Sequence, residues 1–284
     1  MDLPDGCCRI ADISDYFSGS TAGAKLRNFL LNKSKISRNP FLLIFSPQYT
    51  RSFMKIYHYE TLPSTNAEAK KMVLDGARDG VLLAGHQTAG RGRLGRSFFS
   101  ENGIFMSVIV SPEKISFDPG FLTSAMAAAT CRAITEKGFP VGIKWVNDIY
   151  LDGKKICGIL AEAVSMGTKT LAYIVGIGIN VGQSEFPDEI KDIAAYLPLS
   201  EYEKNDLIFR LLGHIESILH EEKDDILPYL KDKSIVLGQP IRFYGAKTGD
   251  GLALDLDESG GLIVLTENKQ KIILTGGEIS VRTK

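Results

Sequence analysis

The sequence predicts a mixed α/β fold, an α+β arrangement in which a large domain with a mixed sheet is followed by a small β-barrel. The 284 residues are 44% hydrophobic and 24% charged, which is enough for one large and one small core. From residue 54 to 236, apolar strand patterns alternate with helical patterns. From residue 237 to 284 the strands become short and are separated by turn residues, as in small barrels.

Residues 1–53 have a different character and are predicted to form a weakly structured extension. They contain the vicinal pair Cys7–Cys8 and show little sustained periodicity. Because strand-like alternation starts at Met54, which could serve as an initiator, we hypothesise that the natural chain begins there. A native protein whose N-terminal residue is Met1 would contradict this hypothesis.

The helices and strands of the large domain are predicted from hydrophobic periodicity and from helix-capping and turn residues. Thr65 and Glu68 have capping-box spacing and predict a helix start, and Asp152–Gly153 is typical of a tight hairpin. The stretch 103–111 is too rich in Ile and Val for a surface strand. In chain order we expect a strand at 54–60, a helix at 65–76, strands at 81–88 and 103–111, a helix at 118–137, two strands within 141–164, a strand at 170–181, and acidic helices at 187–196 and 203–231.

The C-terminal domain should consist of five short strands separated by turns. These are expected at residues 241–245, 252–259, 261–266, 271–276 and 278–282.

Composition excludes several classes of protein. The formal charge of −1, from 33 basic and 34 acidic residues, gives no overall field toward nucleic acid or anionic lipid. The longest apolar run near the N-terminus, 40–45, is too short for a membrane span or a typical signal core. None of the four cysteines has metal-site spacing, and Cys131 and Cys157 should be inert core thiols. We expect a soluble cytoplasmic protein.

The most informative motif is the loop Gly90–Arg96, with the sequence GRGRLGR. Three glycines let a backbone approach a ligand closely, and arginine forks suit phosphate oxygens. By itself the loop could also be an exposed basic turn or an RNA contact. Its position between two core strands favours phosphate binding.

Three further motifs are weaker when taken singly. Lys144–Asp148 ends an apolar strand before a hairpin that returns Lys155, although the lysines could simply be solvated and Asn147–Asp148 a plain turn. Gly176–Asn180 allows close approach to a ligand but lacks the third glycine of a dinucleotide fingerprint. Ser64–Asn66 is first an N-cap, and could alternatively bind a polar ligand head.

Taken together and in order, these motifs resemble the catalytic core of biotin protein ligases. The resemblance rests on Ser64–Asn66, on Gln87 leading into GRGRLGR, on KWVND, on KKICGIL and on GIGIN, and extends from about residue 55 to the C-terminus. It implies a mixed-sheet catalytic domain of the biotin/lipoate ligase type, residues 54–236, and an SH3-like C-terminal barrel, residues 237–284. The implied reaction makes biotinyl-5'-AMP from biotin and ATP with Mg²⁺, and then passes biotin to a lysine of a biotin carboxyl carrier protein.

The resemblance also assigns roles to individual residues. Lys155, Arg91 and Arg93 are implied as catalytic, with Lys155 beside the carboxylate and the α-phosphate. Biotin is implied to contact Ser64, Thr65, Asn66, Gln87, Arg91, Gly92, Arg93, Lys155 and Gly158, with Ile159 and Leu160 as a wall beside the ring. ATP is implied to contact Arg93, Arg96, Phe98, Lys144, Asn147, Asp148 and Asn180. The metal ligands stay unassigned.

The chain departs from the family pattern at two positions and at its N-terminus. Val146 stands where the family often has Pro and should alter only the rigidity of the turn. Phe98 stands where Trp is frequent. An aromatic lid is retained but the indole N–H is lost, so the packing of adenine there stays unassigned. Some members carry a DNA-binding winged helix; residues 1–53 are short for one, so we expect no DNA binding.

Three alternatives stay open at this point. A lipoate ligase shares the fold class and the carrier-lysine chemistry, and the GRGRLGR loop with KWVND argues for biotin instead. A nucleic-acid regulator is disfavoured by the net charge. A vitamin-binding protein without catalysis is excluded only if Lys155 and the arginines are suitably placed. Family members often form homodimers through the central sheet, and the carrier could use the same edge.

Overall fold

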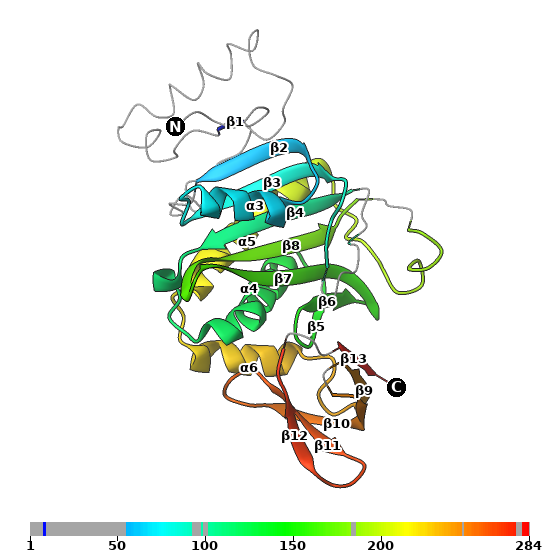
Figure 1. The fold of residues 1–284 in the computed structure, drawn as a ribbon. Helices are drawn as coiled ribbons and strands as arrows, with labels where there is room; N and C mark the ends of the chain where they lie inside the picture. Colours follow the sequence, from blue (N-terminus) through cyan, green and yellow to red (C-terminus); the bar gives the residue numbers. More distant parts are fainter. Residues whose placement is uncertain are drawn as a thin grey trace.

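The computed structural model describes residues 8–9, 55–92, 98, 102–182, 186–245, 247–276 and 280–283, which form two sheets with flanking helices (Figure 1). The larger sheet has the strand order β1-β2-β3-β4-β8-β7-β6-β5, and the smaller has the order β12-β11-β10-β9-β13. Parallel pairing of β2 with β3 and antiparallel pairing elsewhere make the large sheet mixed, as predicted. The smaller sheet forms the predicted C-terminal β domain.

The large sheet contains β1 (Cys8–Arg9), β2 (Ile56–Leu62), β3 (Gly80–Gln87), β4 (Gly103–Val110), β5 (Gly142–Lys144), β6 (Asp148–Leu151), β7 (Lys154–Met166) and β8 (Lys169–Asn180). The small sheet contains β9 (Pro240–Tyr244), β10 (Gly249–Leu256), β11 (Leu262–Thr266), β12 (Lys271–Leu274) and β13 (Ser280–Thr283). The helices are α3 (Thr65–Leu74), α4 (Leu122–Glu136), α5 (Glu201–Ile218) and α6 (Lys223–Lys233), with 3₁₀ turns η4 (Pro112–Lys114) and η5 (Pro119–Phe121).

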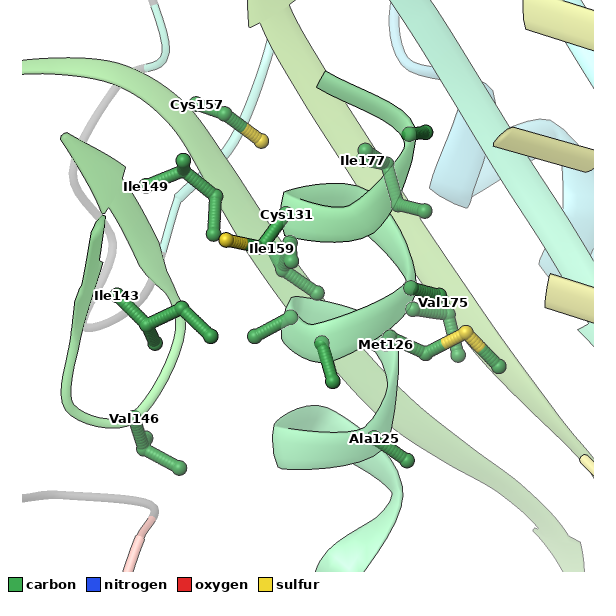
Figure 2. Close-up of a cluster of buried hydrophobic side chains, with 14 of the residues drawn as sticks. Ala125, Met126, Cys131, Ile143, Val146, Ile149, Cys157, Ile159, Val175 and Ile177 are labelled. Atoms are coloured by element: carbon green, nitrogen blue, oxygen red, sulfur yellow. The ribbon is translucent and has the colours of Figure 1, made fainter. Parts of the chain in front are cut away.

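The main core lies between the sheet and α4. Side chains alternate across a strand, so Val175, Ile177 and Ile179 of β8 point to one face, where α4 covers them. Figure 2 shows Cys131 of α4 close to Ile159 of β7 in this layer. Cys131 and Cys157 are fully buried, which confirms their predicted place in the core, and this burial raises the pKa values of both thiols.

The opposite face of the sheet is covered in part by α3. Ala69 and Val73 of this helix pack in a second core cluster with Phe105 and Ile174. The predicted capping box was wrong: the N-cap is Ser64, whose side chain accepts from the Ala67 backbone. The side chains of Thr65 and Asn66 therefore do not cap the helix and are available for other contacts.

Two predictions for the region between residues 141 and 196 were wrong. The stretch 141–164 forms three strands, because residues 145–147 turn between β5 and β6. Residues 188–193 form turns where a helix was expected. Their backbone hydrogen bonds go partly to Lys155, whose N–H donates to the Ile193 carbonyl at 2.8 Å.

The predicted helix over 203–231 is divided into α5 and α6. Tertiary contacts stabilise the residues between the two helices. The Ser116 hydroxyl donates to the Glu221 carbonyl, and Arg132 forms an ion pair with the Glu221 carboxylate at 2.8 Å. Such contacts from distant parts of the chain override a local helical pattern.

The small sheet is attached to the large domain through polar and apolar contacts. The Trp145 indole N–H donates to the Gly260 carbonyl at 2.9 Å, and Ile241, Phe243 and Val264 belong to the main core cluster. Gly260 has φ +79° and lies against the Phe121 ring, so a side chain there would be both strained and crowded. In Figure 1 this sheet lies beyond β5 and α6.

Replacing Gly213 by alanine should raise the free energy of unfolding by about 0.5–1 kcal/mol, because Gly lowers the stability of an exposed helix interior. Gly213 is exposed within α5, and nothing lies within 4 Å of the position its Cβ would occupy. Urea denaturation of both proteins measures the change. A loss of stability would show that the position is more crowded than the structure indicates.

Candidate functional site

The face of the large sheet that carries α3 has an open glycine floor. Gly176 and Gly178 alternate with buried isoleucines along β8, and Gly158 of β7 pairs with Gly178. All three glycines are partly exposed, whereas Ile177 and Ile179 are buried on the other face. A sheet surface without side chains lets a ligand lie directly on the backbone.

Each of these glycines adjoins a polar or aromatic side chain that would obstruct a Cβ. At Gly176 a Cβ would collide with the Asn66 amide, and at Gly178 it would lie 2.7 Å from the Phe98 ring. At Gly158 it would lie 3.1 Å from the Lys155 Nζ. The floor and its surrounding side chains therefore form one site.

A hydrogen-bonded group lies at the Gly176 end of the floor. The Thr65 N–H and hydroxyl both lie within donating distance of Gln87 Oε1, at 2.7 and 3.1 Å. The Ser107 hydroxyl lies 2.7 Å from Thr65 Oγ1 and 2.6 Å from Asn66 Oδ1, and Asn66 Nδ2 donates to the Glu162 carboxylate at 2.7 Å. This polar group brings together three predicted binding residues from α3 and β3.

An ion pair lies at the other end. Lys155 Nζ donates to Asp148 Oδ1 at 2.6 Å, and the two side chains keep 35% and 23% of their surface exposed. Asp148 is directly opposite Gly158 in the register, so the pair borders the glycine floor. Strand geometry places this row about 7 Å from the Gly176 row. The site therefore offers hydroxyl and amide groups, backed by the Glu162 carboxylate, at one end and the Lys155–Asp148 ion pair at the other.

The backbone of Lys155 is fixed by the segment 193–195. Its N–H donates to the Ile193 carbonyl, and its carbonyl accepts from the Ala195 N–H at 2.9 Å. A register shift between β6 and β7 lies next to Lys155, where the pairing skips Ile156. The turn segment that replaces the expected helix thus positions Lys155.

Two predicted asparagines are buried at this end. Asn147 Nδ2 donates to the Ile159 carbonyl at 3.0 Å, and Asn180 Nδ2 donates to the Ala195 carbonyl at 2.9 Å. Asn180 is only 4% exposed, and its Oδ1 has no hydrogen-bond partner among the described residues. A buried amide oxygen without a donor is a position where a ligand N–H can bind.

Lys144 and Phe98 border the same floor. Lys144 lies opposite Asp148 in the β5–β6 register, and its Nζ lies 4.9 Å from the centre of the Tyr150 ring. Phe98 meets Phe105 edge to face, with ring centroids 6.4 Å apart, and lies over Gly178. Phe98 thus places an aromatic ring above the floor.

The arginine loop is described only in part. Arg91 is exposed and Gly92 half-buried at the start of the loop, beyond Gln87. The predicted residues Arg93 and Arg96 lie outside the described residues.

Ile159 does not fit the role the resemblance implied for it. It is 1% exposed and packs in the core against α4, on the other face of the sheet (Figure 2). Strand alternation gives the reason, since Gly158 and Leu160 share the glycine-floor face and Ile159 cannot. Leu160 pairs with Gly176 and remains beside the floor.

Sequence reasoning missed Ser107, Glu162 and the 193–195 segment. Ser107 left one signal, because it is the only polar side chain in the otherwise apolar stretch 103–110. Glu162 and the 193–195 segment left none, since their contacts depend on register and on a distant turn.

A groove of about 660 Å³ runs along β7 between the large domain and the small sheet, and its lining includes Leu160 and Glu162 beside the floor. The lining also includes Asp118, Ala161, Tyr173, Gly260 and Gly276. Among the described strands, β7 beyond Gly158 pairs with β8 alone, which leaves its outer edge open beside the groove. Open strand edges can pair with another chain.

The described residues contain neither a cluster of metal-binding side chains nor a helix suited to cross a membrane. No group of three or more His, Cys, Asp or Glu side chains that could hold a metal ion occurs there. No helix in the described ranges combines the length and apolarity needed to cross a membrane.

Comparison with known proteins gives the same assignment over most of the chain. Residues 59–180 match the Biotin/lipoate A/B protein ligase family, and residues 236–282 match the Biotin protein ligase C terminal domain. A relative from Bacillus subtilis (strain 168), "Bifunctional ligase/repressor BirA", is 42% identical over 233 residues, which are 77% of this chain and 71% of the relative.

A second relative and a solved structure agree. The "Biotin--[acetyl-CoA-carboxylase] ligase" of Mycobacterium tuberculosis (strain ATCC 25618 / H37Rv) is 29% identical, with 77% of this chain and 86% of the relative covered. The structure of the biotin protein ligase from Aquifex aeolicus in complex with biotin and ATP superposes with a TM-score of 0.69 at 29% identity, covering 81% of this chain and 99% of that one. The chain therefore belongs to the biotin protein ligases of the biotin/lipoate A/B protein ligase family.

Proposed function

We propose that this chain is an ATP-dependent biotin protein ligase that makes biotinyl-5'-AMP and transfers the biotin to a lysine of a biotin carboxyl carrier protein. The observation that carries the proposal is the glycine floor, with the hydroxyl and amide groups of Thr65, Asn66 and Gln87 at one end and the Lys155 ammonium at the other. Biotin has the same polarity, with a cyclic urea head and a carboxylate at the end of an alkyl chain. Family membership supports the same assignment.

The first step is charge neutralisation and positioning. A biotin carboxylate oxygen attacks the α-phosphorus of ATP, a P–O–C(O) bond forms, and the bond to pyrophosphate breaks. Lys155 would lie beside the carboxylate and the phosphate and stabilise negative charge in the transition state. Asp148, at 2.6 Å, orients the ammonium before substrates arrive.

In the second step the uncharged amine of the carrier lysine attacks the acyl carbon of the mixed anhydride. An amide bond forms, AMP leaves with the electron pair of the broken C–O bond, and the proton lost by the attacking nitrogen is released to solvent. We propose direct transfer without an acyl-cysteine intermediate, and of the described residues Cys131 and Cys157 are buried in the core, out of contact with a substrate on the floor.

The nucleotide side of the site is proposed at Asn147, Asn180, Lys144 and Phe98. The unpartnered Oδ1 of Asn180 suits an N–H donor such as an adenine amine, and Phe98 offers an aromatic face. Arg91 and Gly92, with Arg93 and Arg96 further along the loop, are proposed to hold the phosphates and to close over the adenylate.

Mg²⁺ is proposed to enter with ATP. Magnesium is commonly bound through one or two carboxylates and substrate phosphates, while it keeps several waters. Asp148 is a fitting carboxylate at this end of the floor. When bound, the ion would neutralise phosphate charge during adenylation.

The domain boundaries, partners and compartment are also proposals. We place the catalytic domain at residues 54–236 and the C-terminal domain at 237–284, with residues 1–53 outside both and without DNA binding. The open edge of β7 and its adjoining groove support docking of the carrier or formation of a homodimer there. The unpaired thiols Cys131 and Cys157 suit the cytoplasm.

A parallel acylation assay tests the function. The purified chain is incubated with ATP, Mg²⁺, a biotin carboxyl carrier domain and either biotin or lipoate, and the carrier mass is followed. We expect a single biotin-dependent mass shift and AMP formation. A shift with lipoate alone would assign the chain to lipoate ligation, and no shift with either acid would contradict the proposal.

A further inference from the structure

Ser107 is an unusual residue for its position. All eight residues of β4 are buried, and Ser107 has an exposed fraction of 0% and is the one polar side chain among them. It pairs with Gly176 across β8, so it lies beneath the polar end of the glycine floor. A buried hydroxyl requires partners, and those of Ser107 are Thr65 and Asn66.

Glu162 fixes the direction of the Asn66 amide. An ionised carboxylate only accepts hydrogen bonds, so the Asn66 Nδ2 must face Glu162, at 2.7 Å. The Oδ1 of Asn66 then faces Ser107, at 2.6 Å, and accepts from its hydroxyl. The Ser107 proton can alternatively go to Thr65 Oγ1, at 2.7 Å.

Gln87 is oriented from the other side of the same group. Its Oε1 accepts from the Thr65 backbone N–H at 2.7 Å, which directs its Nε2 away from Thr65. Gln87 Nε2 lies near Gly90, at the start of the arginine loop, 3.3 Å from where a Gly90 Cβ would be. Donor and acceptor directions are therefore set along a chain from Glu162 to Gln87.

We propose that Ser107 and Glu162 are positioning residues for the urea head of biotin, and act through Asn66 and Thr65 without being ligands themselves. When Ser107 donates to Asn66, both ends of the Asn66 amide have hydrogen-bond partners without substrate. When Ser107 donates to Thr65 Oγ1 and Thr65 donates to Gln87, Asn66 Oδ1 becomes available to accept an N–H of the urea. This inference rests on the proposed biotin ligase function and assigns two residues to its specificity.

The test measures the KM values for biotin and ATP, and the kcat, in Ser107→Ala and Glu162→Ala. Each variant should raise the biotin KM about 10-fold, since one hydrogen bond to a buried group is lost, while the ATP KM and kcat stay within about two-fold. Glu162→Gln retains an acceptor oxygen for Asn66 and should restore most of the affinity. Ser111→Ala removes another buried hydroxyl, four residues along the chain, and should leave all three values unchanged.

A substrate analogue separates positioning from a general structural effect. In 2-iminobiotin an imino N–H replaces the carbonyl oxygen of the urea, so the preference for biotin measures the hydrogen-bond directions of the site. The ratio of kcat/KM for biotin to kcat/KM for 2-iminobiotin should be lower than wild type in Ser107→Ala. In Ser111→Ala it should equal the wild-type ratio.

Several results would overturn the proposal. These are an unchanged biotin KM in both alanine variants, equal changes in the biotin and ATP KM values, and an unchanged analogue ratio in Ser107→Ala. A wild-type chain that does not use biotin at all would instead refute the proposed function, so the two failures are distinguishable.

Discussion

Replacing Lys155 by alanine is expected to lower the kcat for biotinyl-adenylate formation by about 100- to 1,000-fold, the usual effect of removing one preorganised group that stabilises transition-state charge. Lys155 is the cation held at the end of the glycine floor, at 2.6 Å from Asp148. Its loss removes a positive charge and also leaves the Asp148 carboxylate to repel the incoming biotin carboxylate and phosphates. The measurement is ATP- and biotin-dependent pyrophosphate release under saturating substrate.

The neighbouring Lys154 provides a matched control. It has the same side chain, but its Nζ donates to the Lys191 carbonyl, away from the Asp148 pair. Lys154→Ala should keep wild-type kcat within about two-fold. Lys155→Arg should recover only part of the activity, because a planar guanidinium does not occupy the position of a compact ammonium. A Lys155→Ala kcat within five-fold of wild type would refute its charge-stabilising role.

The sequence was informative where local pattern and three-dimensional arrangement coincide. The alternation in Gly176–Asn180 already separates a glycine face from an isoleucine face, as the structure shows. The Asp152–Gly153 turn correctly predicted the hairpin that brings Lys155 back to Asp148. Both features arise within a single strand or hairpin, where side-chain direction follows from periodicity.

Features that depend on distant contacts were not predictable in this way. The acidic stretch 187–196 has a helical pattern, yet its backbone pairs with Lys155 and its Ala195 carbonyl accepts from Asn180. Thr65 had capping-box spacing, but its hydroxyl donates to the Gln87 side chain, 22 residues further along the chain. In each case tertiary hydrogen bonds to the site outweigh a weak local preference.

The glycine floor also predicts a large effect from the smallest possible side chain. Gly176→Ala should raise the biotin KM by about 10- to 100-fold, because overpacking at a fully constrained position costs about 1–3 kcal/mol. The new Cβ would collide with the Asn66 amide, which cannot turn aside since Ser107 and Glu162 hold it on both sides. Steady-state kinetics with biotin varied at saturating ATP measure the change.

Gly213→Ala is the matched control, because the same methyl group is added where nothing lies within 4 Å. It should leave both KM values unchanged. In Gly176→Ala the ATP KM should also stay near wild type, since the crowding occurs at the polar end of the floor and the proposed nucleotide residues lie at the other. A Gly176→Ala enzyme with wild-type biotin KM would mean that Asn66 can move without loss of affinity. That result would contradict both the floor as the biotin site and the rigid positioning of Asn66 on it.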